Sequence, residues 1–166
     1  VKVLRTGKPA NWGGYDAAAW AQAMERPEFA LQFAVAMDCR GVFLGQALAK
    51  KVDLSESHTL LDIAGGSGIY SCAMAAQYSH LKVSVFERPP VDGIARRSIG
   101  NRGYSDRVQV IAGDMFQVDL PSGFDVILLS NVLHDWDDPV AEELFRKAAN
   151  ALPSGGLMLL HDAFLN

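Results

Sequence analysis

Apolar residues gather in short runs along most of the chain, and longer segments of helical period separate these runs. Five runs are rich in Val, Ile and Leu, at residues 60–64, 83–86, 108–112, 124–129 and 157–160. Near-continuous apolar runs are typical of strands that are covered on both faces, as in a parallel sheet. Helical segments fall between them at 68–78, 90–99 and 139–152. The alternation predicts an α/β fold with a doubly wound, mostly parallel sheet.

The first part of the chain, residues 1–58, has the period of helices instead. An alanine-rich stretch covers residues 16–24, and an apolar stripe of helical period follows it until Gly41 and Gly45 interrupt the stripe. We therefore expect a helical linker or cap segment here, ahead of a sheet domain at 59–166.

Composition and charge narrow the class of protein. Hydrophobic residues make up 49% of the chain and charged residues 20%, with a net charge of −4. No basic cluster is denser than Arg96 and Arg97, whereas nucleic acid binds clustered Lys and Arg. No apolar run reaches the roughly 20 residues that span a bilayer, and Cys39 and Cys72 lack disulfide or metal spacing. We expect a cytoplasmic protein with no nucleic-acid or membrane partner.

A glycine-rich turn follows the first predicted strand. It contains Gly65, Gly66 and Gly68, and Glu87 follows at the end of the second predicted strand, 19 residues after Gly68. Glycines at such a turn let the backbone approach a ligand and let the next helix pack closely on the strand. A carboxylate at that spacing is suited to ribose hydroxyls. The pattern predicts a site for a nucleoside-containing cofactor.

Two cofactor classes compete for this turn. A dinucleotide site needs G-x-G-x-x-G, and counting from Gly66 the third glycine position is Ser71, so that fingerprint fails. Asp62 would repel a pyrophosphate but could hold an ammonium group. S-adenosylmethionine carries an ammonium and a sulfonium and no phosphate, so it fits better, and a nicotinamide dinucleotide is the weaker alternative.

Further polar side chains follow the later strands. Asp114 and Met115 come after the third run, where a carboxylate could accept from an exocyclic amine and a thioether could pack on a flat ring. His134 follows the fourth run and Asp162 ends the fifth, and these strands are neighbours in a doubly wound order. A histidine oriented by a carboxylate is a candidate general base, although a structural histidine is the alternative. His161 faces the opposite way from Asp162, which predicts a structural role.

The segments LLDIAGGSG, VSVFERP, VQVIAGDMF, NVLHDWDD and LPSGGLMLL, in this order, resemble the class I S-adenosylmethionine-dependent methyltransferases, which have a Rossmann-like fold. The LHDW and GDMF pieces resemble more narrowly the O-methyltransferases related to caffeate, acetylserotonin and bacterial polyketide-tailoring enzymes. Residues that match the family's functional positions take these roles from the resemblance: Gly65, Gly66 and Gly68 in the cofactor turn, Glu87 at the ribose, Asp114 and Met115 at the adenine, His134 as the base and Asp162 beside it.

The chain also departs from the family pattern. Ala64 stands where relatives usually have the first glycine, and we expect the turn to tolerate the alanine if its φ stays negative. Family members begin with a winged-helix-like dimerisation domain and end with a further helix and a strand hairpin. The resemblance therefore implies a sheet that is incomplete at its C-terminal edge, a truncated chain and a homodimeric assembly.

The pattern and the resemblance together predict O-methylation of a phenolic or enolic hydroxyl on a small aromatic or polyketide-like molecule. His134 would be the base, S-adenosylmethionine the cofactor, and no metal is needed. Two alternatives remain open: the same cofactor could serve carbon or nitrogen methylation or chemistry without methyl transfer, or the chain could be a cofactor-binding or assembly domain without catalysis.

Overall fold

The computed structural model describes residues 22–163, which form a five-stranded sheet with helices on both faces. The strands are β1 (Thr59–Ile63), β2 (Lys82–Glu87), β3 (Val108–Ala112), β4 (Val126–Ser130) and β5 (Leu157–His161). All four strand pairs are parallel, in the order β3-β2-β1-β4-β5. The doubly wound parallel sheet predicted from the sequence is therefore confirmed. Most of the helix expected at residues 16–24 lies outside the described residues.

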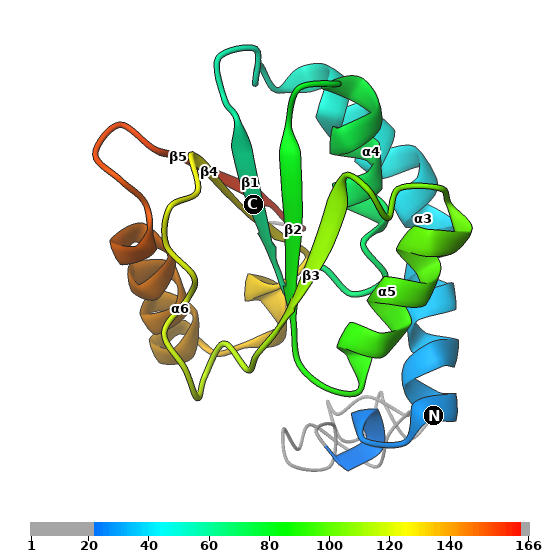
Figure 1. The fold of residues 1–166 in the computed structure, drawn as a ribbon. Coiled ribbons are helices and arrows are strands. Elements are labelled where there is room, and N and C mark those ends of the chain that lie inside the picture. The colour runs from blue at the N-terminus through cyan, green and yellow to red at the C-terminus, as the bar shows by residue number, and fades with distance from the viewer. Residues whose placement is uncertain (1–21, 164–166) are drawn as a thin grey trace.

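The helices form a layer on each face of the sheet. They are α3 (Pro27–Lys51), α4 (Ile69–Gln77), α5 (Val91–Asn101) and α6 (Asp138–Ala151), with a short 3-10 helix, η1 (Leu133–Asp135). Figure 1 shows α3, α4 and α5 on one side of the sheet and α6 on the other. None of the helices within residues 22–163 is long and apolar enough to cross a membrane.

Side chains along the inner strands alternate between two apolar cores. Leu60 and Leu128 belong to the core that also contains residues of α4 and α5. Leu61 and Ile127 belong to the core on the α6 side. Because both faces of the inner strands are covered, the strands have the near-continuous apolar sequence of a buried parallel sheet.

Gly41 and Gly45 do not disturb the long helix α3, contrary to the interrupted stripe in its sequence. Both glycines are buried inside α3, on the face that packs against α4. A Cβ at Gly41 would lie 2.6 Å from Cγ2 of Ile69, and one at Gly45 would lie 3.3 Å from Cβ of Ala73. The glycines therefore continue the contact face of α3, because only residues without a side chain let the two helices approach this closely.

The fourth strand begins two residues later than its apolar run. Asp125 lies just before β4, and its Oδ2 accepts hydrogen bonds from the backbone N–H groups of His58 (2.6 Å) and Thr59 (2.9 Å). Thr59 Oγ1 accepts in return from the N–H of Asp125 at 2.9 Å. The side chain of Asp125 thus fixes the start of β1 and replaces the ladder contacts that a longer β4 would make.

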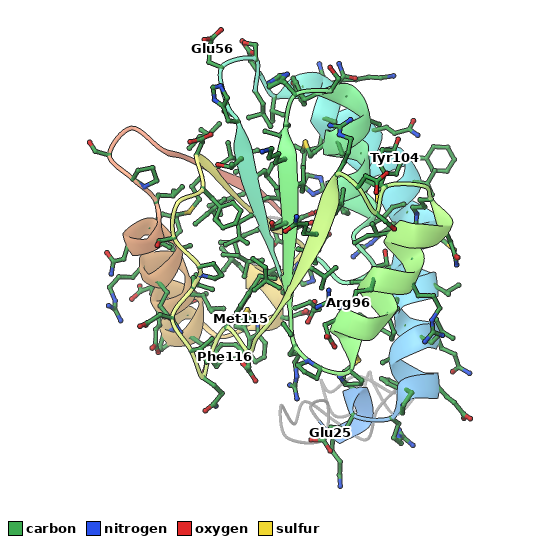
Figure 2. All side chains as sticks on the ribbon, in the orientation of Figure 1. Glu25, Glu56, Arg96, Tyr104, Met115 and Phe116 are labelled. Atoms are coloured by element: carbon green, nitrogen blue, oxygen red, sulfur yellow. The ribbon has the colours of Figure 1, made fainter. Side chains whose placement is uncertain are left out.

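The carboxyl ends of the strands form one end of the molecule. The order of the sheet reverses at β1, which has β2 on one side and β4 on the other. Figure 2 shows Glu56, which precedes β1, at one end of the sheet and Met115 and Phe116, which follow β3, at the opposite end. Ligands of doubly wound sheets bind beside the carboxyl ends where the order reverses.

Candidate functional site

A cavity of about 380 Å³ lies at the carboxyl ends of β1, β2, β3 and β4, with α3 forming part of its wall. Seven of the nine site residues predicted from the sequence line this cavity: Asp62, Gly65, Gly66, Glu87, Asp114, Met115 and His134. The other two contact the lining from behind. Gly68 is the N-cap of α4, and Asp162 binds His134. The structure thus brings the predicted residues to one place.

The turn after β1 has an unusual backbone. Ala64 has a φ of +54°, so the condition under which we expect the turn to tolerate an alanine, a negative φ, is not met. The N–H of Ala64 still bonds to the carbonyl of Phe86 at 2.8 Å, so the chain turns sharply while the ladder with β2 continues. A left-handed backbone costs an L-residue about 1–2 kcal/mol, which explains why a glycine is the easier residue here. Gly68 also has a positive φ, +75°, and a Cβ there would lie 2.9 Å from Ile99 of α5.

Asp62 is a buried carboxylate in the wall of the cavity. Its Oδ2 accepts a hydrogen bond from Ser71 Oγ at 2.7 Å, whereas its buried Oδ1 has no partner among the described residues. Burial raises the pKa of Asp62 to about 7, against the lowering effect of the Ser71 hydrogen bonds. A Cβ at Gly65 would lie 2.6 Å from Asp62 Oδ2, so the glycine leaves this carboxylate its space. The unpartnered oxygen is free to accept from a cationic ligand.

Glu87 is a second buried carboxylate, at the end of β2. Its Oε2 accepts from the N–H of Gly66 at 3.1 Å and its Oε1 accepts from the N–H of Arg88 at 2.8 Å. Burial raises the pKa of Glu87 to about 7, although these two hydrogen bonds lower it. Each oxygen keeps a lone pair for a further donor. Glu87 therefore both fixes the glycine turn and can accept from ligand hydroxyls.

Met115 and Asp114 lie on the loop after β3, and α6 holds this loop in place. Lys147 of α6 donates from Nζ to the carbonyl oxygens of Met115 at 2.5 Å and Val118 at 2.8 Å. Asp114 Oδ1 accepts from the N–H of Phe116 at 2.9 Å. The loop therefore presents Asp114 and Met115 to the cavity from a fixed backbone.

His134 and Asp162 meet across the carboxyl ends of β4 and β5. Asp162 Oδ1 accepts from His134 Nδ1, and Asp162 Oδ2 accepts from the N–H groups of Leu133 at 3.1 Å and His134 at 3.3 Å. Burial raises the pKa of Asp162, but the hydrogen bonds from His134 and from the Ala163 N–H outweigh it and leave this pKa below its ordinary value. The ionised carboxylate orients the imidazole through Nδ1, so that Nε2 is the nitrogen on the other side of the ring.

Asp135 is a site residue that the sequence analysis did not assign. Its Oδ1 lies 3.3 Å from His134 Nε2, so the imidazole stands between two carboxylates. Burial raises the pKa of Asp135, while the charges of His134 and Arg40 lower it. Its place next to His134 in the chain was a signal, but adjacent residues in a 3-10 helix do not point the same way, so the spacing alone could not show it.

The α3 wall of the cavity was also missed. Its residues from this helix are Ala30, Phe33, Ala34, Met37, Asp38 and Arg40. The sequence showed only an apolar stripe, which does not say what the stripe covers. His161, in contrast, stays outside the cavity lining: its Nδ1 lies 3.0 Å from Ser130 Oγ and its ring packs against Tyr70.

The parallel sheet, the glycine turn and the two buried carboxylates define an α/β domain built to bind a cofactor at the carboxyl ends of its strands. The particular family follows from the sequence as a whole. The O-methyltransferase domain model matches residues 4–166, and the chain belongs to this family.

Curated relatives in this family differ in their chemistry. The chain is 36% identical over 119 residues to a 3-hydroxy-5-methyl-1-naphthoate 3-O-methyltransferase of Streptomyces sahachiroi. This alignment covers 72% of the chain and 34% of the relative. The chain is also 36% identical over 162 residues to the aclacinomycin 10-hydroxylase RdmB of Streptomyces purpurascens. That alignment covers 98% of the chain and 43% of the relative.

A solved structure shows the same fold. An O-methyltransferase from neocarzinostatin biosynthesis, in complex with S-adenosylmethionine and 2-hydroxy-5-methyl naphthoic acid, matches with a TM-score of 0.80 and 32% identity. The match covers 96% of this chain and 49% of that one. The chain thus spans less than half the length of each of these three proteins.

Proposed function

We propose that the chain is the cofactor-binding part of an S-adenosylmethionine-dependent O-methyltransferase that acts on a phenolic or enolic hydroxyl of a small aromatic or polyketide-like molecule. The observation that carries the proposal is the position of His134. Its imidazole, oriented by Asp162, lines the same cavity as the two buried carboxylates Asp62 and Glu87. A proton acceptor and a site suited to a cationic cofactor therefore share one space.

The residues of the cavity fit S-adenosylmethionine, which supplies an electrophilic methyl group on a sulfonium centre. The unpartnered Oδ1 of Asp62 would accept from the ammonium group, and Glu87 would accept from the ribose hydroxyls. Asp114 would accept from the adenine amine and Met115 would pack on its ring. A Cβ at Gly66 would meet no protein atom within 4 Å, so this glycine opens onto the cavity and lets a ligand approach the backbone.

His134 would take the proton of the acceptor hydroxyl. A free phenol has a pKa of about 10 and a free imidazole one of about 6.5, so complete proton transfer between them costs about 5 kcal/mol. Asp162, ionised and hydrogen-bonded to Nδ1, stabilises the imidazolium that forms, and Asp135 lies 3.3 Å from Nε2 and adds to this effect. The two carboxylates thus reduce the cost of activating the hydroxyl.

A second function has its own support. The relative RdmB, named as a hydroxylase, aligns with nearly the whole chain at 36% identity. A sequence similar to nearly the whole chain therefore also occurs in a protein named for other chemistry, and we keep non-methyl-transfer chemistry as the second candidate. The nature of the product separates the two: a methyl ether supports the first, and a hydroxylated product supports the second.

We further propose that the active assembly is a cytoplasmic homodimer in which residues 1–58 form a helical linker or cap and residues 59–166 the cofactor domain. The exposed apolar side chains of α3, Leu31, Val35 and Val42, support the association of this helix with another surface.

The proposal is tested by replacing the base. In the intact enzyme that carries this chain, His134→Ala should reduce methyl transfer from labelled S-adenosylmethionine by about 10²- to 10⁴-fold, because the general base is lost. The affinity for S-adenosylhomocysteine should stay nearly unchanged. His58→Ala is the matched control, since the His58 side chain is 83% exposed and away from the cavity lining. Full turnover in His134→Ala would show that another group removes the proton.

A further inference from the structure

Asp38 of α3 joins three elements that are far apart in the sequence. Its Oδ1 accepts a hydrogen bond from Ser67 Oγ in the glycine turn. Its Oδ2 accepts from Nη2 of Arg102, the residue that caps α5, at 2.5 Å. The side chains of Asp38 and Arg102 are only 20% and 26% exposed, and Ser67 is buried. The cluster therefore ties α3 and α5 to the turn between β1 and α4.

Asp38 lines the cavity, but, unlike Asp62, it already has a cationic protein partner. Both of its oxygens have protein partners, and the guanidinium of Arg102 balances its charge. Asp62, in contrast, has one oxygen without a partner in the described part of the chain. Asp62 is therefore the better receptor for a cation, whereas the Ser67 contact of Asp38 points to an indirect effect on a ligand through the glycine turn.

The glycine turn needs such a tether. Its backbone has a positive φ at Ala64, Gly66 and Gly68, and glycine-rich segments have many competing conformations. Within the turn, the N–H of Gly68 bonds to the carbonyl of Gly65 at 2.9 Å, and Glu87 holds the N–H of Gly66. The Ser67 hydroxyl adds an anchor from outside the sheet, on α3. Fixing the turn before the ligand arrives lowers the entropy lost on binding.

We propose that Asp38 is a positioning residue that holds the glycine turn in its cofactor-receptive conformation and makes cofactor affinity depend on the placement of α3. This inference rests on the proposed function, because it takes the turn to be a cofactor site. Its expected size is about a tenfold loss of affinity for S-adenosylhomocysteine in Asp38→Ala, typical of a lost charge-assisted hydrogen bond.

Two measurements on the full chain test the proposal. Without ligand, amide hydrogen exchange at residues 65–72 should become faster in Asp38→Ala and in Ser67→Ala, with little change in β4. Asp92→Ala is the matched control, because it also breaks an ion pair, the one between Asp92 Oδ2 and Arg96 Nε on α5 at 3.9 Å. The side chain of Asp92 is 19% exposed, close to the 20% of Asp38. Exchange at residues 65–72 should not change in that variant.

Titration with S-adenosylhomocysteine then separates positioning from direct contact. Asp38→Asn, which keeps an oxygen for Ser67, should retain more affinity than Asp38→Ala, and the effects of Asp38→Ala and Ser67→Ala should not add in the double variant. Additive effects, or an Asn variant as weak as the Ala variant, would mean that Asp38 contacts the ligand by charge and would overturn the proposal. Unchanged exchange and affinity in Asp38→Ala would also overturn it. No binding to the unaltered chain would instead refute the proposed function, and with it the role of Asp38 in cofactor affinity.

Discussion

At the scale of single residues, the site depends on two carboxylates that are removed from water. Asp62 and Glu87 line the cavity, and burial raises the pKa of each to about 7. A buried carboxyl group without a cation is costly to ionise, whereas a bound ammonium group stabilises the ionised form. The ligand-free protein therefore stores an unfavourable interaction that the proposed cofactor relieves.

This cost has a consequence for stability. Because the folded-state pKa of Asp62 lies above that of the unfolded chain, its contribution is present at low pH and is lost as the pH rises through about 7. Asp62→Asn should remove this pH dependence. Between pH 5 and pH 8, the difference in stability between the variant and the unaltered chain should therefore shift by about 2.6 kcal/mol in favour of the variant. Urea unfolding at the two pH values measures this difference. In the control variant Asp106→Asn, at an exposed residue, the free energy of unfolding should change with pH as it does in the unaltered chain. The same pH dependence in all three proteins would show that Asp62 is not held protonated.

Which residues line the cavity could be predicted where they lie at the end of a strand or a few residues after it. Seven of the nine predicted residues are in the lining, because parallel strands bring their carboxyl ends to one edge whatever lies between them. Asp38 and Arg102 could not be predicted, since their contact joins residues 64 positions apart and depends on how two helices are rotated. The left-handed backbone of Ala64 could not be predicted either, because an alanine in the sequence does not reveal that tertiary packing imposes a positive φ.

At the scale of elements, α3 shows how a helix outside the sheet completes the site. Its buried glycines bring it close to α4, and its polar residues Asp38 and Arg40 reach the cavity. The helical period of its sequence predicted the helix, but the two glycines were interpreted as an interruption. Their meaning appears only when the partner helix is present, because a glycine within a helix costs stability unless close packing requires it.

The close contact between α3 and α4 predicts an unusual result for a glycine substitution. Gly41→Ala should destabilise the protein by about 1–3 kcal/mol, because its Cβ would collide with Ile69. Gly93→Ala in α5 is the matched control, since a Cβ there meets no atom within 4 Å, and it should stabilise by about 0.5 kcal/mol. Urea midpoints at constant m-value provide the comparison. If both variants were stabilised alike, α3 and α4 would not pack as closely as described.

At the scale of the whole molecule, apolar surface is exposed on two elements. Leu157 and Leu160 are exposed on β5, the outer strand of the sheet that the described residues form, and the exposed apolar side chains of α3 include Phe43 at 75%. The parallel sheet and its order were predictable, because alternating strands and helices leave few other topologies. Which apolar side chains of α3 stay exposed was less predictable, because their exposure depends on how α3 is rotated on the sheet.

This surface predicts self-association. The isolated chain should form dimers or larger species at micromolar concentration, and Phe43→Lys should shift it toward the monomer, because a charge on α3 opposes apolar contact. Phe145→Lys on α6, at a side chain that is 45% exposed, should leave association unchanged. Light scattering over a range of concentrations distinguishes these outcomes. A monomer at all concentrations would contradict the proposed role of α3.

The central claim is that the cavity beside the glycine turn binds S-adenosylmethionine. Two glycines allow a controlled test: Gly66 and Gly103 have φ values of +59° and +78°, and a Cβ at either would meet no protein atom within 4 Å. Alanine at each position should therefore cost a similar amount of stability, about 1 kcal/mol. Only Gly66 lines the cavity.

The most direct measurement is calorimetric titration of the unaltered chain, Gly66→Ala and Gly103→Ala with S-adenosylhomocysteine, with a nicotinamide dinucleotide as the competing ligand. The account predicts saturable binding of S-adenosylhomocysteine to the unaltered chain and to Gly103→Ala, strongly weakened binding to Gly66→Ala, and no binding of the dinucleotide. Absence of binding to the unaltered chain, equal binding by all three proteins, or preference for the dinucleotide would contradict it.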